Sequence, residues 1–213
     1  MDIRIGKYSR VLPGKAWLNG EVYLENPLCD GLTFLTEMYN RLGIDYRKFF
    51  KMDRLSKLGF LAAELLMDGF DPEQPNEDTG IVLFNRSSSL DTDGQFQQTI
   101  LRDGEHYFPS PALFVYTLPN IVTGELAIRH KIHGETAFYV LPHFRGELPA
   151  EIIRATLSSA GLRYLLAGWT EAYRDDTEAF MMLCEAGGDA NDGSLPLTPE
   201  NVERICPDWK QEK

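Results

Sequence analysis

Hydrophobic residues recur at helical spacing between residues 54 and 67. Four leucines of this segment lie three or four positions apart, namely Leu55, Leu58, Leu61 and Leu65. This spacing places them on one face of a helix. The pattern therefore predicts a helix with one strongly buried face, which ends before Gly69.

Short apolar runs predict the strands of a sheet. The run at 80–85 is continuously apolar and follows a polar loop, which is typical of a strand covered on both faces. Further strand patterns lie at 136–141, 164–169 and 179–185. Helical patterns lie at 91–101, at 124–130 running up to Gly134, and at 151–160 starting from Pro149 or Ala150.

The alternation of strands and helices predicts the fold class. Such alternation is typical of α/β folds. We expect one domain over residues 1–213, with a single mixed, mostly parallel sheet of about five strands and helices on both faces. Beyond Gly187 the sequence predicts a loop and a short charged tail.

The net charge of the chain excludes one class of binding partner. The 213 residues include 21 basic and 32 acidic ones, giving a net charge of −11. Such a surface repels phosphate backbones, so we expect no nucleic-acid partner. The N-terminus lacks the apolar stretch of a signal peptide, and no run approaches the about 20 apolar residues that cross a bilayer, so we expect no membrane span.

The cysteines and histidines do not form a recognisable metal motif. Cys29, Cys184 and Cys206 are scattered without C-x-x-C spacing, which predicts a reducing, cytoplasmic location and neither metal nor cofactor. Cys184 lies in an apolar strand pattern and is expected to be an inert core thiol. His130 and His133 could begin a metal site, but a solvated basic helix end is the favoured interpretation.

Several motifs resemble one enzyme family. Residues 51–58 read KMDRLSKL, 109–128 contain S-P-x-x-F followed by N-x-x-x-G-x-L-A-I, and 165–172 read LLAGWTEA. Together with Gly134, they resemble the N-terminal half of β-ketoacyl synthases, the condensing enzymes of fatty-acid and polyketide synthesis, which have the thiolase fold. The resemblance runs from about residue 50 to 186.

Two departures from that family bear on catalysis. The family carries its nucleophilic cysteine at the start of a helix, whose dipole helps to hold the thiolate. An ungapped count from Gly134 places His143 at that position. The resemblance also implies a second half with two catalytic histidines, for which 213 residues leave no room. We therefore expect a degenerate synthase that does not catalyse condensation, comparable in role to the cysteine-less chain-length factors.

The resemblance also implies site residues. A dimer interface is expected at Asn120, Thr123, Gly124 and Glu125. The alternative is that Gly124 permits close helix packing and Glu125 favours a helix N-terminal turn. An aromatic acyl or ligand pocket, with membership of the core as the alternative, is expected at Phe114, Tyr116, Phe138 and Phe144.

Two sets of polar residues are weaker candidates for contact with a ligand or a partner protein. Arg86 to Ser89 follow a buried strand and could hold a phosphate or pantetheine, although an ordinary polar loop is favoured. Docking of an acidic acyl carrier protein would need a local basic patch, for which the sequence offers Arg145, Arg154, Arg163 and Arg174.

Three functions follow from these features. The first is a non-catalytic accessory subunit in fatty-acid-like or polyketide biosynthesis, with aryl-polyene-type synthesis as one option. It would form a homodimer, or a heterodimer with a full-length ketosynthase, and an acyl carrier protein is a further candidate partner. The second is an acyl-thioester hydrolase or transferase that uses His143. The third is a small-molecule binding module.

Overall fold

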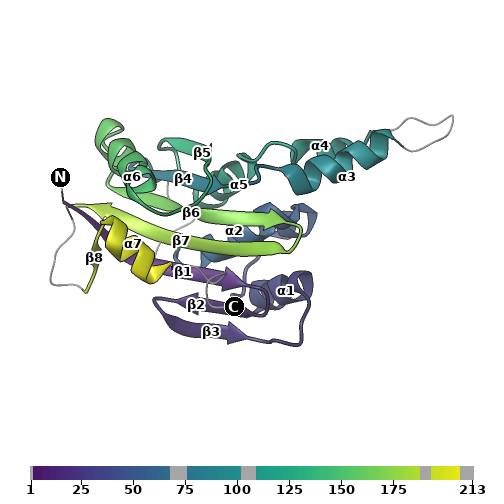
Figure 1. The fold of residues 1–213 in the computed structure, drawn as a ribbon, viewed down its shortest axis with the longest axis horizontal. Helices are drawn as coiled ribbons and strands as arrows, with labels where there is room; N and C mark the ends of the chain where they lie inside the picture. Colours follow the sequence, from purple (N-terminus) through teal and green to yellow (C-terminus); the bar gives the residue numbers. More distant parts are fainter. Residues whose placement is uncertain (1, 68–75, 102–108, 188–192, 207–213) are drawn as a thin grey trace.

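A computed structural model describes residues 2–67, 76–101, 109–187 and 193–206. Its strands form one sheet, drawn in Figure 1 in the order β3-β2-β1-β7-β6-β4-β5, with β8 beside β1. The strands are β1 (Ile3–Leu12), β2 (Lys15–Leu18), β3 (Glu21–Glu25), β4 (Thr79–Asn85), β5 (Thr136–Val140), β6 (Tyr164–Tyr173), β7 (Asp176–Ala186) and β8 (Leu195–Pro196).

The centre of the sheet consists of β1, β7, β6, β4 and β5. Strand β4 is parallel to both β5 and β6, whereas β7 is antiparallel to β6 and to β1. Four of these five strands therefore point the same way, and β7 opposes them. The predicted single mixed sheet is confirmed, and its mostly parallel character holds for this central part.

The predicted number of strands was too low. The described residues contain eight strands rather than about five, because β2 and β3 extend β1 as antiparallel neighbours and β8 adds a short edge pairing. Antiparallel pairs need only tight turns. One such turn, Asn19 and Gly20 between β2 and β3, has positive φ at both residues, as a two-residue hairpin turn requires.

Helices cover both faces of the sheet, as predicted. Neighbouring residues of β4 alternate between two apolar clusters, with Leu83 in one and Phe84 in the other. In Figure 1, α7 lies in front of β7 and β1, and α2 lies behind the sheet. The helices are α1 (Gly31–Arg41), α2 (Arg54–Glu64), α3 (Leu90–Ile100), α4 (Pro111–Val115), α5 (Ile121–His130), α6 (Glu147–Ser159) and α7 (Pro199–Ile205), with a 3₁₀ helix η1 (Arg47–Lys51).

Helix α2 matches the predicted helix. Its N-cap is Asp53, whose side chain accepts a 2.9 Å hydrogen bond from the Ser56 backbone N–H. At Gly59 a Cβ would lie 2.9 Å from the Val122 side chain of α5, so glycine allows the two helices to pack closely. Together α1, α2 and α5 enclose the larger apolar cluster.

Three predicted boundaries were wrong. Helix α5 ends at His130, because Lys131 takes a left-handed conformation with φ 49°, so the helix does not run on to Gly134. Helix α6 begins at Glu147, because Pro149 falls in the first turn, where no backbone N–H is needed. The expected loop beyond Gly187 contains β8 and α7, the latter capped by Thr198. Within the described parts of the chain, no helix has the length and apolar character to cross a membrane.

Candidate functional site

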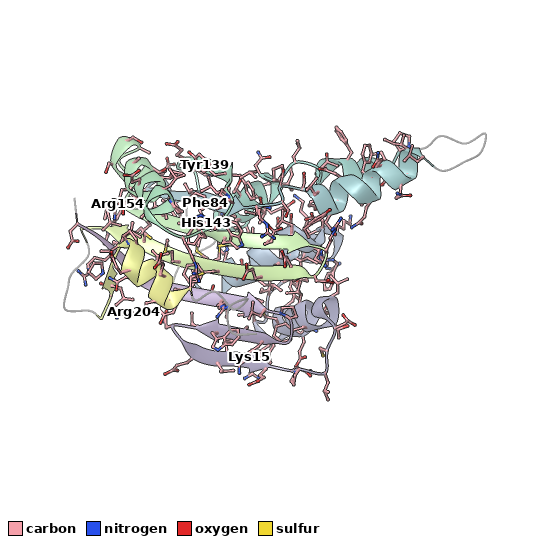
Figure 2. The ribbon with its side chains drawn as sticks, viewed as in Figure 1. Lys15, Phe84, Tyr139, His143, Arg154 and Arg204 are labelled. Atoms are coloured by element: carbon pink, nitrogen blue, oxygen red, sulfur yellow. The ribbon has the colours of Figure 1, made fainter. Side chains whose placement is uncertain are left out.

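His143 lies in the loop that joins β5 to α6. It is exposed, and its Nδ1 lies 3.2 Å from the backbone oxygen of Arg145. Helix α6 starts four residues later, at Glu147, so His143 does not occupy a helix N-terminus as the resemblance implied. The loop from residue 141 to 146 contains no cysteine. Figure 2 labels His143 next to Phe84, the β4 residue whose ring packs against that of Phe144.

A cavity of about 160 Å³ opens beside His143. Its walls come from segments that are far apart in sequence: β1, the loops after β4 and β5, strands β6 and β7, and the end of α7. They are Arg10, Arg86, Pro142, His143, Phe144, Arg145, Trp169, Glu171, Glu178, Ala179, Phe180 and Cys206. The cavity therefore combines cationic and aromatic side chains.

Glu171 fixes the loop after β4. Its buried carboxylate accepts hydrogen bonds from the backbone N–H groups of Arg86, at 3.0 Å, and Ser87, at 3.1 Å. The Ser88 N–H binds the Asn85 side chain at 2.9 Å, and the Ser89 hydroxyl donates to the Thr117 carbonyl at 2.6 Å. These donors are already used within the chain, which favours the polar-loop interpretation over a phosphate cradle.

Two of the three thiols are poorly suited to nucleophilic attack. Burial raises the pKa of Cys184 to about 12. Desolvation, followed by the hydrogen bond to Glu37, raises the pKa of Cys29. Attack requires the thiolate, so a raised pKa disfavours it at neutral pH. The third, Cys206, lines the cavity beside His143.

The four aromatic residues expected in one pocket occupy different places. Phe144 lines the cavity and packs near Trp169 and Phe180, whereas Tyr116 belongs to the larger apolar cluster on the opposite face, against which Phe138 packs. Phe114 is exposed on α4. The structure brings only Phe144 of this set to the cavity.

The four expected interface residues also differ in placement. Asn120 is exposed, and with Thr123 it lines a hollow beside β5. At Gly124 a Cβ would meet no atom within 4 Å. Glu125 faces the other way: it is 4% exposed, lies 2.8 Å from the Lys48 Nζ, and accepts a 3.1 Å hydrogen bond from Tyr46. Its carboxylate is thus engaged within the chain.

Strand β5 is the edge strand next to these residues. It pairs with β4 on one side only, and its Tyr139 and Val140 are exposed. Nine of the 13 exposed large hydrophobic residues in the described chain lie between residues 90 and 148, in the segment that runs from α3 to the start of α6. Figure 1 shows this segment along one border of the molecule. The nine residues are Leu90, Leu101, Phe114, Val115, Leu118, Ile128, Tyr139, Val140 and Leu148. We call these nine residues, with Asn120 and Gly124, the β5 surface.

The two histidines considered for metal are engaged with carboxylates. His130 Nε2 lies 2.6 Å from Glu64, and His133 Nδ1 lies 3.4 Å from Glu77. Across the described residues no cluster of three metal-binding side chains occurs. His130 is buried rather than solvated, which corrects the expectation of a solvated helix end, and its Nδ1 has no hydrogen-bond partner.

The arginines proposed as a basic patch are dispersed. Arg154 pairs with Glu147, and Arg163 pairs with Glu185. Arg163 and Arg174 flank opposite ends of β6, a separation of about 35 Å for a strand of this length. These side chains therefore do not share one docking surface.

The sequence matches no protein-family model and no curated protein. The structure, by contrast, is similar to solved ones. "The ishigamide ketosynthase/chain length factor" has a TM-score of 0.62 and 19% identity, over 90% of this chain and 64% of that chain. The chain has a ketosynthase-like fold.

Two further solved structures share that fold. One is the ketosynthase ApeO in complex with its chain length factor ApeC from Xenorhabdus doucetiae, with a TM-score of 0.58 and 15% identity over 100% of this chain and 93% of that chain. The other is AntDE:AntF, a type II PKS acyl-carrier protein in complex with its ketosynthase, with a TM-score of 0.59 and 12% identity over 87% of this chain and 62% of that chain. The chain thus spans less than two thirds of the ishigamide and AntDE:AntF chains.

Sequence reasoning missed part of the cavity. Arg10 was not considered, because no element was predicted for the segment that forms β1. Glu171 belongs to the motif at 165–172. However, the hydrogen bonds that it accepts from two backbone N–H groups depend on how β4 and β6 pair. Only the basic character of Arg10 in an acidic chain could have drawn attention to it.

Proposed function

We propose that this chain is a non-catalytic, ketosynthase-like accessory subunit in a fatty-acid-like or polyketide pathway, pairing with a full-length ketosynthase through the β5 surface. The observation that carries this proposal is the exposed edge strand β5, with exposed apolar side chains along the same border of the molecule. An unpaired edge strand exposes backbone N–H and C=O groups that readily pair with another strand. The surrounding apolar surface gains free energy when a partner covers it.

The loop between β5 and α6 supports the absence of condensation. No cysteine lies between β5 and α6, and His143 forms a hydrogen bond with the backbone of its own loop. Acyl-imidazoles hydrolyse readily, so an imidazole is a poor carrier of a growing chain. The loss of the nucleophile fits a subunit that depends on the chemistry of its partner.

The similar structures support the choice of partner. All three of those named above contain a ketosynthase, and two of them contain a chain length factor as well. In the ApeO and ApeC complex, this chain covers 93% of the matched chain, so a chain of nearly this length takes part in such a complex. An acyl carrier protein is left out of the proposal, because the candidate arginines do not form one patch.

A pair of edge-strand variants tests the proposal. The chain is tagged, recovered from its native host, and the eluate is analysed by mass spectrometry and light scattering. Val140→Lys places a charge on β5, where Val140 is 53% exposed, and Val22→Lys is the matched control on the opposite edge strand, where Val22 is 51% exposed. Lysine on an edge strand opposes strand pairing without disturbing the core.

The proposal predicts that the wild type and Val22→Lys each retain a full-length ketosynthase in an amount equal to their own. Val140→Lys is expected to lose the ketosynthase. A homodimer of the wild type that retains no ketosynthase contradicts the pairing. Equal retention by both variants contradicts the assignment to β5.

An altered acyl-transfer activity is a second candidate, because His143 and Cys206 line the same cavity. An imidazole can act as a general base beside a thiol. Turnover of a small acyl thioester that disappears in His143→Ala would favour this function. The absence of turnover with the wild type would argue against it.

A further inference from the structure

Two residues that line the cavity beside His143 each carry a buried N–H donor that has no acceptor. The donors are the Nη2 of Arg10 and the Nε1 of Trp169. Trp169 is only 7% exposed. Buried donors are nearly always paired, and an unpaired one is costly. Two such donors at one small cavity suggest that a ligand supplies the acceptor.

The carboxylates at the cavity do not bind these two donors. Both oxygens of Glu171 are used by backbone N–H groups, Oε2 by Arg86 and Ser87 and Oε1 by Ala172. Glu178 has an interaction of its own within the chain, and neither the Arg10 Nη2 nor the Trp169 Nε1 has a hydrogen-bond partner. These two donors therefore have no acceptor among the carboxylates that line the cavity.

The guanidinium of Arg10 also favours an anion. Three arginines and two glutamates line the cavity, and the Arg86 side chain is paired with Asp176. Among the described residues, Arg10 makes a cation–π contact with Trp17, at 5.6 Å from the ring centroid, and no ion pair with a carboxylate. Its guanidinium is suited to bind a carboxylate through parallel hydrogen bonds.

The remaining walls are aromatic. The ring centroid of Phe144 lies 6.4 Å from that of Trp169 and 5.9 Å from that of Phe180, and all three residues belong to the apolar cluster beneath the cavity. Such walls pack well against a flat apolar body. The volume of about 160 Å³ limits that body to a small one.

We infer that this cavity binds a small carboxylate that carries a flat, unsaturated or aromatic body. The carboxylate accepts hydrogen bonds from Arg10 and Trp169, and the body packs against Phe144 and Phe180. The site does not depend on the β5 surface or on any activity of His143.

Benzoate is the probe, measured by titration calorimetry on the full chain. Benzamide has the same ring without the charge, and inorganic phosphate has charge without a ring. Trp169→Phe removes the indole N–H while keeping a ring, Arg10→Gln removes the charge, and Arg163→Gln is the control at an arginine outside the cavity. Thermal melting establishes that each variant is folded.

The expected result is saturable benzoate binding that weakens about tenfold or more in Arg10→Gln and in Trp169→Phe, with no change in Arg163→Gln. Benzamide is expected not to bind measurably. Absence of benzoate binding to the wild type would overturn the inference, and so would equal binding by the wild type and both cavity variants. Phosphate binding as tight as benzoate binding would overturn the assignment of a flat apolar body.

If a variant fails to fold, the wild type still provides a test. With ¹⁵N-labelled tryptophan, benzoate is expected to shift the indole N–H signal of Trp169 in a saturable way, because that N–H gains an acceptor. A Trp169 signal that does not move at saturating benzoate would contradict the site.

Discussion

The Lys48 ammonium lies 2.8 Å from the buried carboxylate of Glu125, and the Tyr46 hydroxyl donates a 3.1 Å hydrogen bond to the same carboxylate. This contact joins η1 to α5 across a long stretch of sequence. A residue that the resemblance assigned to a dimer interface thus binds two side chains of its own chain.

Removal of this carboxylate should destabilise the fold. Glu125→Ala leaves the Tyr46 hydroxyl and the Lys48 ammonium without their partner, and we expect the free energy of unfolding to fall by about 1–3 kcal/mol. Lys48→Ala leaves the buried Glu125 carboxylate without its cation, so we expect a comparable loss of about 1–3 kcal/mol. Urea denaturation of both variants measures the losses. Unchanged stability in both variants would contradict this role.

Two tyrosines near Glu125 predict a loss of stability at high pH. Burial, followed by the charge of Glu125, raises the pKa of Tyr46 to about 12 and that of Tyr116 to about 12, from an ordinary value of 10.0. The folded state therefore keeps these protons when the unfolded state has lost them, so the free energy of unfolding is undiminished below pH 10 and falls between pH 10 and 12.

Denaturation at several alkaline pH values measures this slope, and Tyr46→Phe with Tyr116→Phe should make it shallower. Absorbance at an ultraviolet wavelength specific for tyrosinate measures the ionisation independently, because both phenols should ionise at a higher pH than exposed tyrosines. An unchanged slope in the double variant would contradict the assignment.

Gly168 should tolerate no side chain. A Cβ at this position would collide with the backbone oxygen of Phe180 on the neighbouring strand β7. We expect Gly168→Ala to destabilise the protein by about 3 kcal/mol or more, because the backbone of β7 would have to move. Gly94→Ala is the matched control: its Cβ would meet nothing within 4 Å on α3, and we expect a gain of about 0.5–1 kcal/mol. Thermal melting distinguishes the two. Equal stability of Gly168→Ala and Gly94→Ala would contradict the close approach of β7 to Gly168.

The cysteines should differ in reactivity in the native state. Cys184 is fully buried with a pKa of about 12, so a thiol-directed alkylating agent at mildly alkaline pH should leave it unmodified until the protein unfolds. Cys29 is partly exposed but has a raised pKa, so it should react more slowly than a free thiol. Mass spectrometry of the digested protein reads both sites. Rapid labelling of Cys184 in the folded protein would contradict its burial.

The periodicity of hydrophobic residues predicted the central strand β4 and helix α2, because the burial of their side chains follows a regular pattern. Every residue of β4 is buried, and α2 carries one continuous apolar face, so composition alone indicates a strand and a helix. Strand β1 gives a weaker signal, because a register shift between Ile5 and Lys7 interrupts its alternation of buried and exposed residues. Helix α7 is short, and the expected loop was predicted in its place.

The candidate site was less predictable than the fold. The sequence resemblance drew attention to His143, and local pattern predicted a loop there. The cavity, however, depends on β1 lying beside β7, which brings Arg10 towards Trp169 and Phe180. Strand order is a tertiary property that periodicity does not encode.

Hydrogen exchange of the chain mixed with a full-length ketosynthase from its host tests the proposed pairing most directly. Alone, the backbone N–H groups on the outer edge of β5 should exchange quickly, since no neighbouring strand covers them. With the ketosynthase present, we predict strong protection of Thr136–Val140 and no change in the opposite edge strand, Glu21–Glu25. Unchanged exchange in Thr136–Val140 at saturating ketosynthase would contradict the proposal that this chain pairs through β5.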